Sequence, residues 1–184
     1  MMALDTQLFY ALNSLAGHSP VLDWLIVFCA SYLAYIVGIL FFVTVYFSSY
    51  PVRKKWEIFW VTSIASVVSR FGVAEVIRFF YHRVRPFNAL PNVHNLFTDS
   101  AWSFPSGHAT FFFAMATALY FYNKTWGTWF FIAAAVITIG RVAAGVHYPL
   151  DIIGGAVIGI AVACVTFYLA RKMVVKEVPE ADVN

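Results

Sequence analysis

The feature that most restricts the fold of this chain is a series of apolar runs long enough to cross a lipid bilayer. They are Val21–Ser49, Trp56–Phe80, Pro105–Tyr122, Trp126–Val142 and Leu150–Ala170. A transmembrane helix needs about 20 mainly apolar residues, and only helices and closed barrels satisfy their backbone polar groups in lipid. Charged residues make up 11% of the chain, whereas a soluble domain has roughly 25%. The sequence therefore predicts an all-α, polytopic membrane helix bundle with about five transmembrane helices, built as a single domain over residues 1–184.

Three parts of this arrangement are less regular. Residues 3–16 have apolar side chains at helical spacing but are too short to span a bilayer. We expect a short N-terminal amphipathic helix there, at the membrane interface or packed on the bundle, and an ordinary surface helix fits nearly as well. The run Val21–Ser49 forms either one tilted span or a short helix up to Ala30 followed by a span from about Leu33. The charged segment 171–184 is expected to be a frayed cytoplasmic tail.

The positions of the cations predict how the bundle is oriented. One side collects most of them: Arg53, Lys54, Lys55, Lys124, Arg171, Lys172 and Lys176. Because short cytoplasmic loops are rich in Lys and Arg, this side should face the cytoplasm, and loops 81–104 and 143–149 should face outward. Four arginines lie near the outer ends of spans, against this bias: Arg78, Arg83, Arg85 and Arg141. Anion binding is the obvious reason for their placement.

Clusters of residues that could carry chemistry fall on this outer side. They are Arg78 followed after six residues by Arg85-Pro86, then Pro105-Ser106-Gly107-His108, then Arg141 followed by His147 and Asp151. Ionisable groups beside or inside membrane spans are costly, and the default reading of them is functional. The alternative for the last cluster is that Arg141 snorkels to the interface while His147 and Asp151 lie in a polar loop.

The residue types in these clusters suit phosphoryl transfer. Arginine binds phosphate through two parallel hydrogen bonds, so Arg78, Arg85 and Arg141 together can neutralise one phosphate. Gly107 lets the backbone approach a ligand closely, and the free N–H groups of a helix start, with the Ser106 hydroxyl beside them, form a phosphate cradle. The two histidines supply a nucleophile and an acid, and a carboxylate can hold an imidazole in one tautomer. The residues alone do not say which histidine attacks.

Together the clusters resemble the motifs of the type-2 phosphatidic acid phosphatase superfamily of membrane lipid phosphatases. The family pattern is Lys-x6-Arg-Pro, then Pro-Ser-Gly-His, then Ser-Arg-x5-His-x3-Asp, and the resemblance runs from about Arg78 to Asp151. Two positions depart from it. Arg78 stands where the family usually has Lys, which keeps the charge but not the shape, and Gly140 stands where it usually has Ser. Within the family, the chain looks most similar to bacterial undecaprenyl-diphosphate phosphatases, which act at the outer face of the inner membrane.

The resemblance implies a metal-independent hydrolase without a cofactor. By that analogy His147 attacks phosphorus to form a phosphohistidine, Asp151 orients His147, and His108 protonates the leaving oxygen and then activates water. The phosphate would be held by Arg78, Arg85, Arg141, Ser106 and the Gly107 backbone. The implied substrate is a lipid phosphate from the bilayer, with a polyprenyl (undecaprenyl) diphosphate favoured. A phosphatidic acid, phosphatidylglycerol phosphate or lipid A phosphatase, or a lipid-phosphate transferase with the same intermediate, stays open as an alternative.

The remaining polar residues indicate nothing more specific. His18, His82 and His94 match no motif, and no helical His-x3-His pair points to a metal site. The net charge of +3 is too small to indicate a nucleic-acid partner. Arg83 is expected to snorkel or contact lipid headgroups. Arg70 could pair with another helix, and it is assigned no catalytic role. The sequence leaves the oligomeric state open.

Overall fold

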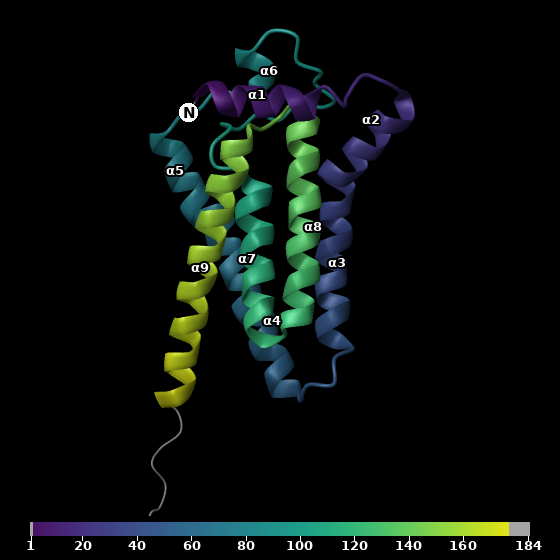
Figure 1. The fold of residues 1–184 in the computed structure, drawn as a ribbon. Helices are drawn as coiled ribbons and strands as arrows, with labels where there is room; N and C mark the ends of the chain where they lie inside the picture. The colour runs from purple at the N-terminus through teal and green to yellow at the C-terminus, as the bar shows by residue number, and fades with distance from the viewer. Residues whose placement is uncertain (1, 177–184) are drawn as a thin grey trace, which may run out of the picture.

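The computed structural model describes residues 2–176, and the elements within that range are all helical. In chain order they are α1 (Met2–Asn13), α2 (Pro20–Val27), η1 (Phe28–Tyr32), α3 (Leu33–Tyr46), α4 (Val52–Val67), η2 (Val68–Val73), α5 (Ala74–Phe80), α6 (Pro86–Ala89), α7 (Gly107–Tyr122), α8 (Lys124–Ala143) and α9 (Pro149–Lys176). Figure 1 shows the long helices running side by side as a bundle, with α1 lying across one end. The predicted all-α helix bundle is confirmed.

The number of spans is close to the predicted five, but one of them is short. In the part of the chain that the structure describes, four stretches are long and apolar enough to cross a membrane, namely Pro20–Tyr46, Val52–Phe80, Lys124–Ala143 and Pro149–Met173. The remaining helix of the bundle, α7, has 16 residues, which is about 24 Å at 1.5 Å per residue. It therefore falls short of the ~30 Å of hydrocarbon that a bilayer presents.

The helix α7 lies at the centre of the bundle, and the neighbouring helices approach its backbone closely. Ala114, Ala116 and Ala118 are fully buried, so little side-chain volume keeps the facing helices away. On α9, a Cβ atom at Gly159 would lie 2.4 Å from the carbonyl oxygen of Thr110. Any residue with a side chain would clash there, so glycine is needed for this close approach. This contact holds the beginnings of α7 and α9 together, and both carry clusters singled out in the sequence.

Each of the first two spans contains a π-helical segment. The segment η1 joins α2 to α3 within one continuous helix, and η2 does the same for α4 and α5. Of the two alternatives for Val21–Ser49, the continuous span is found, and the π segment lies where the break was expected. Figure 1 shows α2 leaning away from the bundle at this point. A π turn holds about one residue more than an α turn and is frequent at functional sites.

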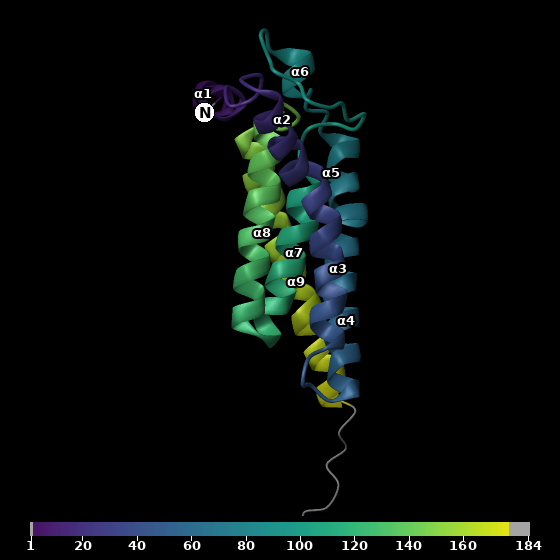
Figure 2. The same ribbon diagram turned by 90° about the vertical axis from the view of Figure 1, so that its right-hand side faces the viewer.

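The N-terminal helix α1 is packed on the bundle rather than free at its surface. Phe9 is fully buried and packs with Val142 and Tyr148, whereas Leu4 and Leu8 are exposed. The same end of the molecule is covered by the segment between α5 and α7, which contains α6 (Figure 2). The expected short amphipathic helix therefore forms a cap over one end of the bundle.

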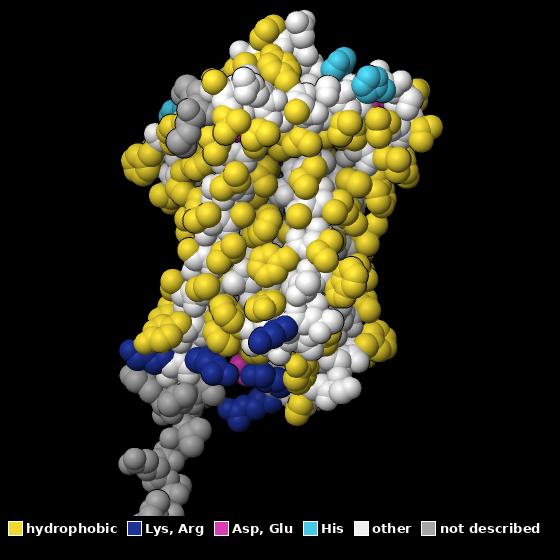
Figure 3. Space-filling view, viewed as in Figure 1, with side chains coloured by type: hydrophobic (Ala, Val, Ile, Leu, Met, Phe, Trp, Pro, Cys, Tyr) yellow, Lys and Arg dark blue, Asp and Glu magenta, His cyan; other side chains and the backbone are white. Residues whose placement is uncertain are grey.

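The opposite end of the molecule carries the cations. Figure 3 shows Lys and Arg side chains gathered at the lower end of the visible face, with hydrophobic side chains over the length above them. The helix α9 continues through Lys176, so the tail that was expected to fray from Arg171 is helical up to that residue. The rest of the predicted tail, residues 177–184, lies outside the described range.

Candidate active site

The beginning of α7 is held against the beginning of α9 by its capping residue. The Ser106 hydroxyl accepts a backbone N–H from the first turn of α7 at 3.5 Å, and the Ser106 N–H donates to the carbonyl oxygen of Asp151 at 3.1 Å. Gly107 and His108 follow in that turn, and the His108 ring stacks on Phe112 with a centroid distance of 6.2 Å. The second sequence cluster thus meets the third.

His147 and Asp151 form a buried pair. Their side chains are 1% and 0% exposed, and His147 Nδ1 lies 3.5 Å from Asp151 Oδ2. The same carboxylate oxygen accepts the Ser103 hydroxyl and, at 2.9 Å, the N–H of Tyr148. Asp151 is therefore fixed by hydrogen bonds on the side from which it faces the imidazole, and this arrangement favours a proton on Nδ1.

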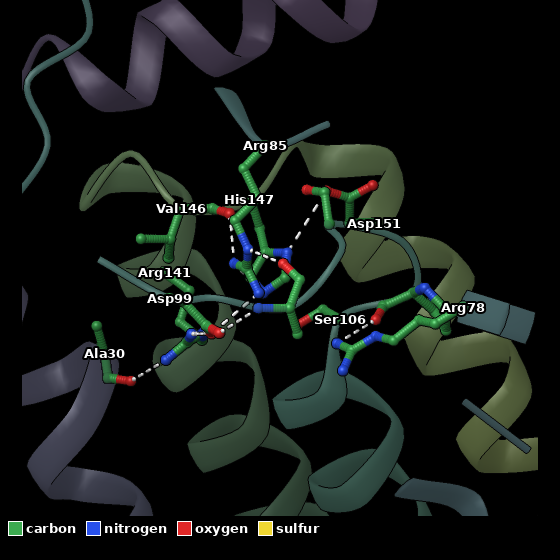
Figure 4. Close-up of polar contacts among 12 residues, drawn as sticks. Ala30, Arg78, Arg85, Asp99, Ser106, Arg141, Val146, His147 and Asp151 are labelled. Carbon is green, nitrogen blue, oxygen red and sulfur yellow. Dashed lines mark hydrogen bonds and ion pairs between the residues drawn. The ribbon is translucent and has the colours of Figure 1, made fainter. Parts of the chain in front are cut away.

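The other ring nitrogen of His147 faces an arginine. Nε2 lies 3.4 Å from Nη1 of Arg85, and Figure 4 shows the two side chains facing each other. Burial lowers the pKa of His147 to about 4; the hydrogen-bonding interaction with Asp151 opposes this shift, and the charges of Arg141 and Arg85 reinforce it. The ring is therefore neutral near pH 7, and a proton on Nδ1 leaves the Nε2 lone pair free to attack an electrophile.

Two arginines converge beside this nitrogen from different segments. Arg85 donates to the carbonyl oxygen of Ala101 at 2.6 Å through Nε and to that of Val146 at 2.8 Å through Nη1. Arg141, in the last turn of α8, donates to the carbonyl oxygen of Ala30 at 3.3 Å. Both guanidiniums are at least 95% buried, with exposures of 3% each. Backbone carbonyls thus help to orient both side chains.

The third predicted arginine approaches from α5. Arg78 is 4% exposed, donates to the carbonyl oxygen of Pro105 at 2.9 Å and pairs with Glu75 at 3.0 Å. Pro105 begins the Pro-Ser-Gly-His sequence, so Arg78 lies against the α7 cradle (Figure 4). All the residues predicted for the site are therefore brought to one end of the bundle.

Several buried polar atoms at this end lack a hydrogen-bond partner. Over residues 2–176, the buried side-chain atoms without a hydrogen-bond partner include Arg78 Nε, Arg141 Nε and His147 Nδ1. Buried polar groups are nearly always hydrogen-bonded, so a concentration of exceptions requires an explanation. Two of these atoms are guanidinium donors, and a bound oxyanion would supply acceptors for them.

The departure from the family pattern at Gly140 has a structural reason. A Cβ atom at this position would lie 3.0 Å from the backbone nitrogen of Ala30 and 3.2 Å from Cβ of Cys29. The missing side chain lets α8 approach η1, and the adjacent Arg141 then reaches the carbonyl oxygen of Ala30. Atoms of η1 therefore occupy the space that a serine side chain at position 140 would need.

Arg83, expected to contact lipid headgroups, instead links two buried carboxylates. Its Nη1 lies 2.6 Å from Asp151 Oδ1, and its Nη2 pairs with Asp5 of α1. Asp5 also accepts the N–H of Leu150 at 2.9 Å. The expectation was wrong because α1 folds back over the bundle and brings a buried carboxylate to this arginine, a contact between segments far apart in the chain.

We expect this link to appear as a coupling between substitutions. Arg83→Met leaves two buried carboxylates without their shared cation, so it should lower the Tm of the purified protein, and Asp5→Asn should lower the Tm less in that background than in the wild type. The coupling should be roughly 0.5–3 kcal/mol. Thermal unfolding of both single variants and the double variant measures it, and strictly additive shifts would mean that Asp5 and Arg83 do not interact.

The structure also places an acid in the site that sequence reasoning did not select. Asp99, in the segment before α7, has one oxygen 3.0 Å from Arg85 Nη2 and 3.0 Å from Arg141 Nη2. Burial alone would raise its pKa, but the two guanidiniums hold it below the ordinary value, so the carboxylate is ionised at neutral pH. A charged residue in a long polar loop gave no signal that it would meet these arginines.

Known proteins are similar to this chain over most of its length. The chain is 30% identical to the undecaprenyl-diphosphatase BcrC of Bacillus subtilis (strain 168), over 89% of this chain and 83% of that protein. It is 28% identical to the bacitracin transport permease protein BcrC of Bacillus licheniformis, over 92% of this chain and 82% of the relative. The crystal structure of Aquifex aeolicus LpxE superposes with a TM-score of 0.69 at 29% identity, covering 90% of this chain and 95% of that one.

These matches confirm the resemblance inferred from the motifs. The similarity to bacterial undecaprenyl-diphosphatases extends over most of the chain, well beyond the motifs themselves. Residues 54–174, which include every residue predicted for the site, match the PAP2 superfamily. This chain belongs to the PAP2 superfamily.

Proposed function

We propose that this protein is a membrane phosphatase that removes the terminal phosphate of a polyprenyl diphosphate, such as undecaprenyl diphosphate. The observation that carries the proposal is the meeting of buried Arg85 and Arg141 beside a neutral His147, with Arg78 and its unpartnered Nε at the adjoining α7 cradle. These groups fit one phosphoryl group in contact with a nitrogen nucleophile. The undecaprenyl-diphosphatase relative supports the choice of a diphosphate lipid.

The proposed first step forms a phosphohistidine. His147 Nε2 attacks phosphorus, and the bond between that phosphorus and the bridging oxygen breaks. Asp151 stabilises the positive charge that develops on the ring and keeps its Nδ1 proton in place. His108 must enter this step protonated, a form that the negative charge of the bound headgroup favours, and it gives its proton to the departing oxygen, so the prenyl monophosphate leaves in a stable form.

The proposed second step returns the enzyme to its starting state. His108, now neutral, takes a proton from water, whose oxygen attacks the phosphohistidine phosphorus. The P–N bond breaks, and inorganic phosphate leaves with His147 neutral again. Throughout, the arginines, Ser106 and the Gly107 N–H stabilise the negative charge on the phosphoryl oxygens. Positioning and charge stabilisation are the main contributions that phosphoryl transfer needs from a protein.

We further propose that the site faces the outer side of a bacterial plasma membrane and that residues 1–184 act as one domain. The cations at the end opposite to the site support this orientation, since short cytoplasmic loops are enriched in Lys and Arg (Figure 3). The substrate would then enter from the bilayer, with its tail among the spans and its headgroup in the site.

One experiment tests the substrate assignment. Purified protein is assayed for phosphate release from prenyl diphosphates, phosphatidic acid and phosphatidylglycerol phosphate, with an alcohol added in parallel. We expect the highest kcat/KM on a prenyl diphosphate, with water rather than the alcohol as the acceptor. Preference for a glycerophospholipid would replace the substrate assignment, and a phosphorylated alcohol as the main product would make the protein a transferase.

Catalysis should not require a divalent metal. The buried arginines already supply the positive charge that a metal would bring to the phosphoryl oxygens, so EDTA should leave the rate of phosphate release unchanged. Vanadate, which resembles the pentacoordinate phosphorus in the transition state, should inhibit. Loss of activity in EDTA with recovery on adding Mg²⁺ or Zn²⁺ would contradict the proposal.

A further inference from the structure

Arg70 lies against the glycine of the α7 cradle. It belongs to η2, the π-helical segment of the second span. A Cβ atom built on Gly107 would lie 2.3 Å from Arg70 Nε and 2.8 Å from its Cζ, so the guanidinium occupies the space that a side chain at 107 would need. Gly107 directly precedes His108, and Arg70 is therefore a neighbour of the group that would protonate the leaving oxygen.

The charge of Arg70 is only partly balanced. Its Nη1 pairs with Glu75, and the same carboxylate oxygen pairs with Arg78 at 3.0 Å. Two guanidiniums thus share one carboxylate beside the positive N-terminal end of α7. Glu75 is 46% exposed, whereas the Arg70 and Arg78 side chains are 25% and 4% exposed. Two positive charges with one negative charge between them favour a further anion as a partner. Glu75 accepts a hydrogen bond from Nη1 of Arg70, which leaves most of the five guanidinium N–H donors for another acceptor.

The π-helical segment explains how Arg70 and Arg78 share a partner. In an unbroken α-helix, residues eight apart differ by roughly 80° around the axis, because each residue turns the helix by about 100°. The π segment accommodates about one extra residue, which reduces the difference to roughly 20°. Arg70 and Arg78 therefore lie on nearly the same side of the helix, at two heights along the wall of the site.

An apolar cavity lies along the second span, about one helical turn before Arg70. It has a volume of about 450 Å³ and lies between α3, α4 and α7, with Val67, Phe111 and Phe112 among its lining residues. Val67 precedes Arg70 by one helical turn, and Phe112 stacks on His108. Tyr35 and Ile39 line its outer side and are 74% and 63% exposed, so the cavity opens toward the lipid. A chain of hydrocarbon lying in it would place its headgroup at Arg70 and His108.

We propose that Arg70 binds the leaving phosphate of a diphosphate substrate and so gives the enzyme its preference for diphosphates over monophosphates. The inference rests on the proposed function. In a diphosphate, the group between the attacked phosphorus and the lipid tail is a second phosphate. Arg70 contacts the cradle at Gly107, and Val67, three residues before it, lines the apolar cavity. A lipid monophosphate has a single ester oxygen there, which offers a guanidinium little charge to bind.

The proposal is tested by comparing two substrates with one tail, farnesyl diphosphate and farnesyl monophosphate. Arg70→Gln should reduce kcat/KM for the diphosphate roughly 10- to 100-fold, the range expected for losing hydrogen bonds to a charged group. The monophosphate should change by less than about threefold. Arg70→Lys should fall between the two on the diphosphate, because it keeps the charge but not the fork of donors. Arg53→Gln, an equivalent change at the other end of the same span, should alter neither rate.

A binding measurement makes the result independent of turnover. Methylenediphosphonate, a diphosphate that cannot be cleaved at the bridge, should inhibit the wild type more strongly than inorganic phosphate does, and Arg70→Gln should remove most of that difference. Equal losses on both farnesyl substrates, or an unchanged preference for methylenediphosphonate, would overturn the role of Arg70. If the wild type releases phosphate from neither farnesyl substrate, the proposed function itself fails, whatever the variants do.

Discussion

Replacing His147 with alanine should abolish phosphate release from every substrate. The side chain is buried, neutral and within 3.4 Å of Arg85 through Nε2, and no other imidazole nitrogen of the predicted site faces an arginine at such a distance in the contacts of residues 2–176. If Nε2 forms the new bond to phosphorus, its loss removes the intermediate itself, so the rate should fall on the order of 10⁴-fold or more.

The measurement is a pre-steady-state assay with p-nitrophenyl phosphate together with labelling of the protein. The wild type should give a burst of nitrophenol and an acid-labile, base-stable phosphoryl label, and His147→Ala should give neither. His18→Ala, an imidazole removed from an exposed loop, is the matched control and should behave as the wild type does. A retained burst in His147→Ala would assign the nucleophile elsewhere.

The effect of replacing His108 should depend on the leaving group. Proton donation by a general acid contributes typically 10²–10⁴-fold in rate, and a leaving group that is already a stable anion needs that proton less. His108→Ala should therefore lose most on an alkyl monophosphate, whose departing alkoxide is very basic, and less on a prenyl diphosphate. Formation of the phosphoenzyme from p-nitrophenyl phosphate should be affected least.

The same variant should show a second defect that separates the two histidines. Because His108 would also activate the water of the second step, His108→Ala should accumulate phosphohistidine from p-nitrophenyl phosphate, visible as a burst followed by slow turnover. Uniform losses across the three leaving groups would remove the acid role. If His108→Ala loses the burst while His147→Ala keeps it, the two roles are reversed.

The sequence predicted the parts of the molecule that depend on local pattern. Long apolar runs indicated the helix bundle, and the cation bias indicated which ends of the spans lie together. The placement of Arg78, Arg85 and Arg141 against that bias then pointed to one site. These inferences succeed because hydropathy and helix length are set by neighbouring residues.

The residues that sequence reasoning missed depend on geometry that no short pattern encodes. Arg83 meets Asp5 only because α1 folds across the end of the bundle, and Asp99 meets two arginines only because its loop turns inward. Arg70 pairs with Glu75 across a π segment, so the i,i+3 and i,i+4 spacings that predict contacts on an α-helix do not apply to it. In each case tertiary packing determines the ion-pair partner, and the spacing of residues in the sequence does not predict it.

The ion pairs of Asp99 bear on how the product leaves. Inorganic phosphate and this carboxylate would compete for Arg85 and Arg141, since both anions need the same guanidinium donors. A pair of arginines that is free for one tenth of the time binds its ligand about tenfold more weakly. An internal competitor of this kind weakens the hold on the substrate and on the phosphate alike, but the substrate keeps its tail and its second phosphate as further attachments. The loop that carries Asp99 therefore favours release of phosphate from the site after each turnover.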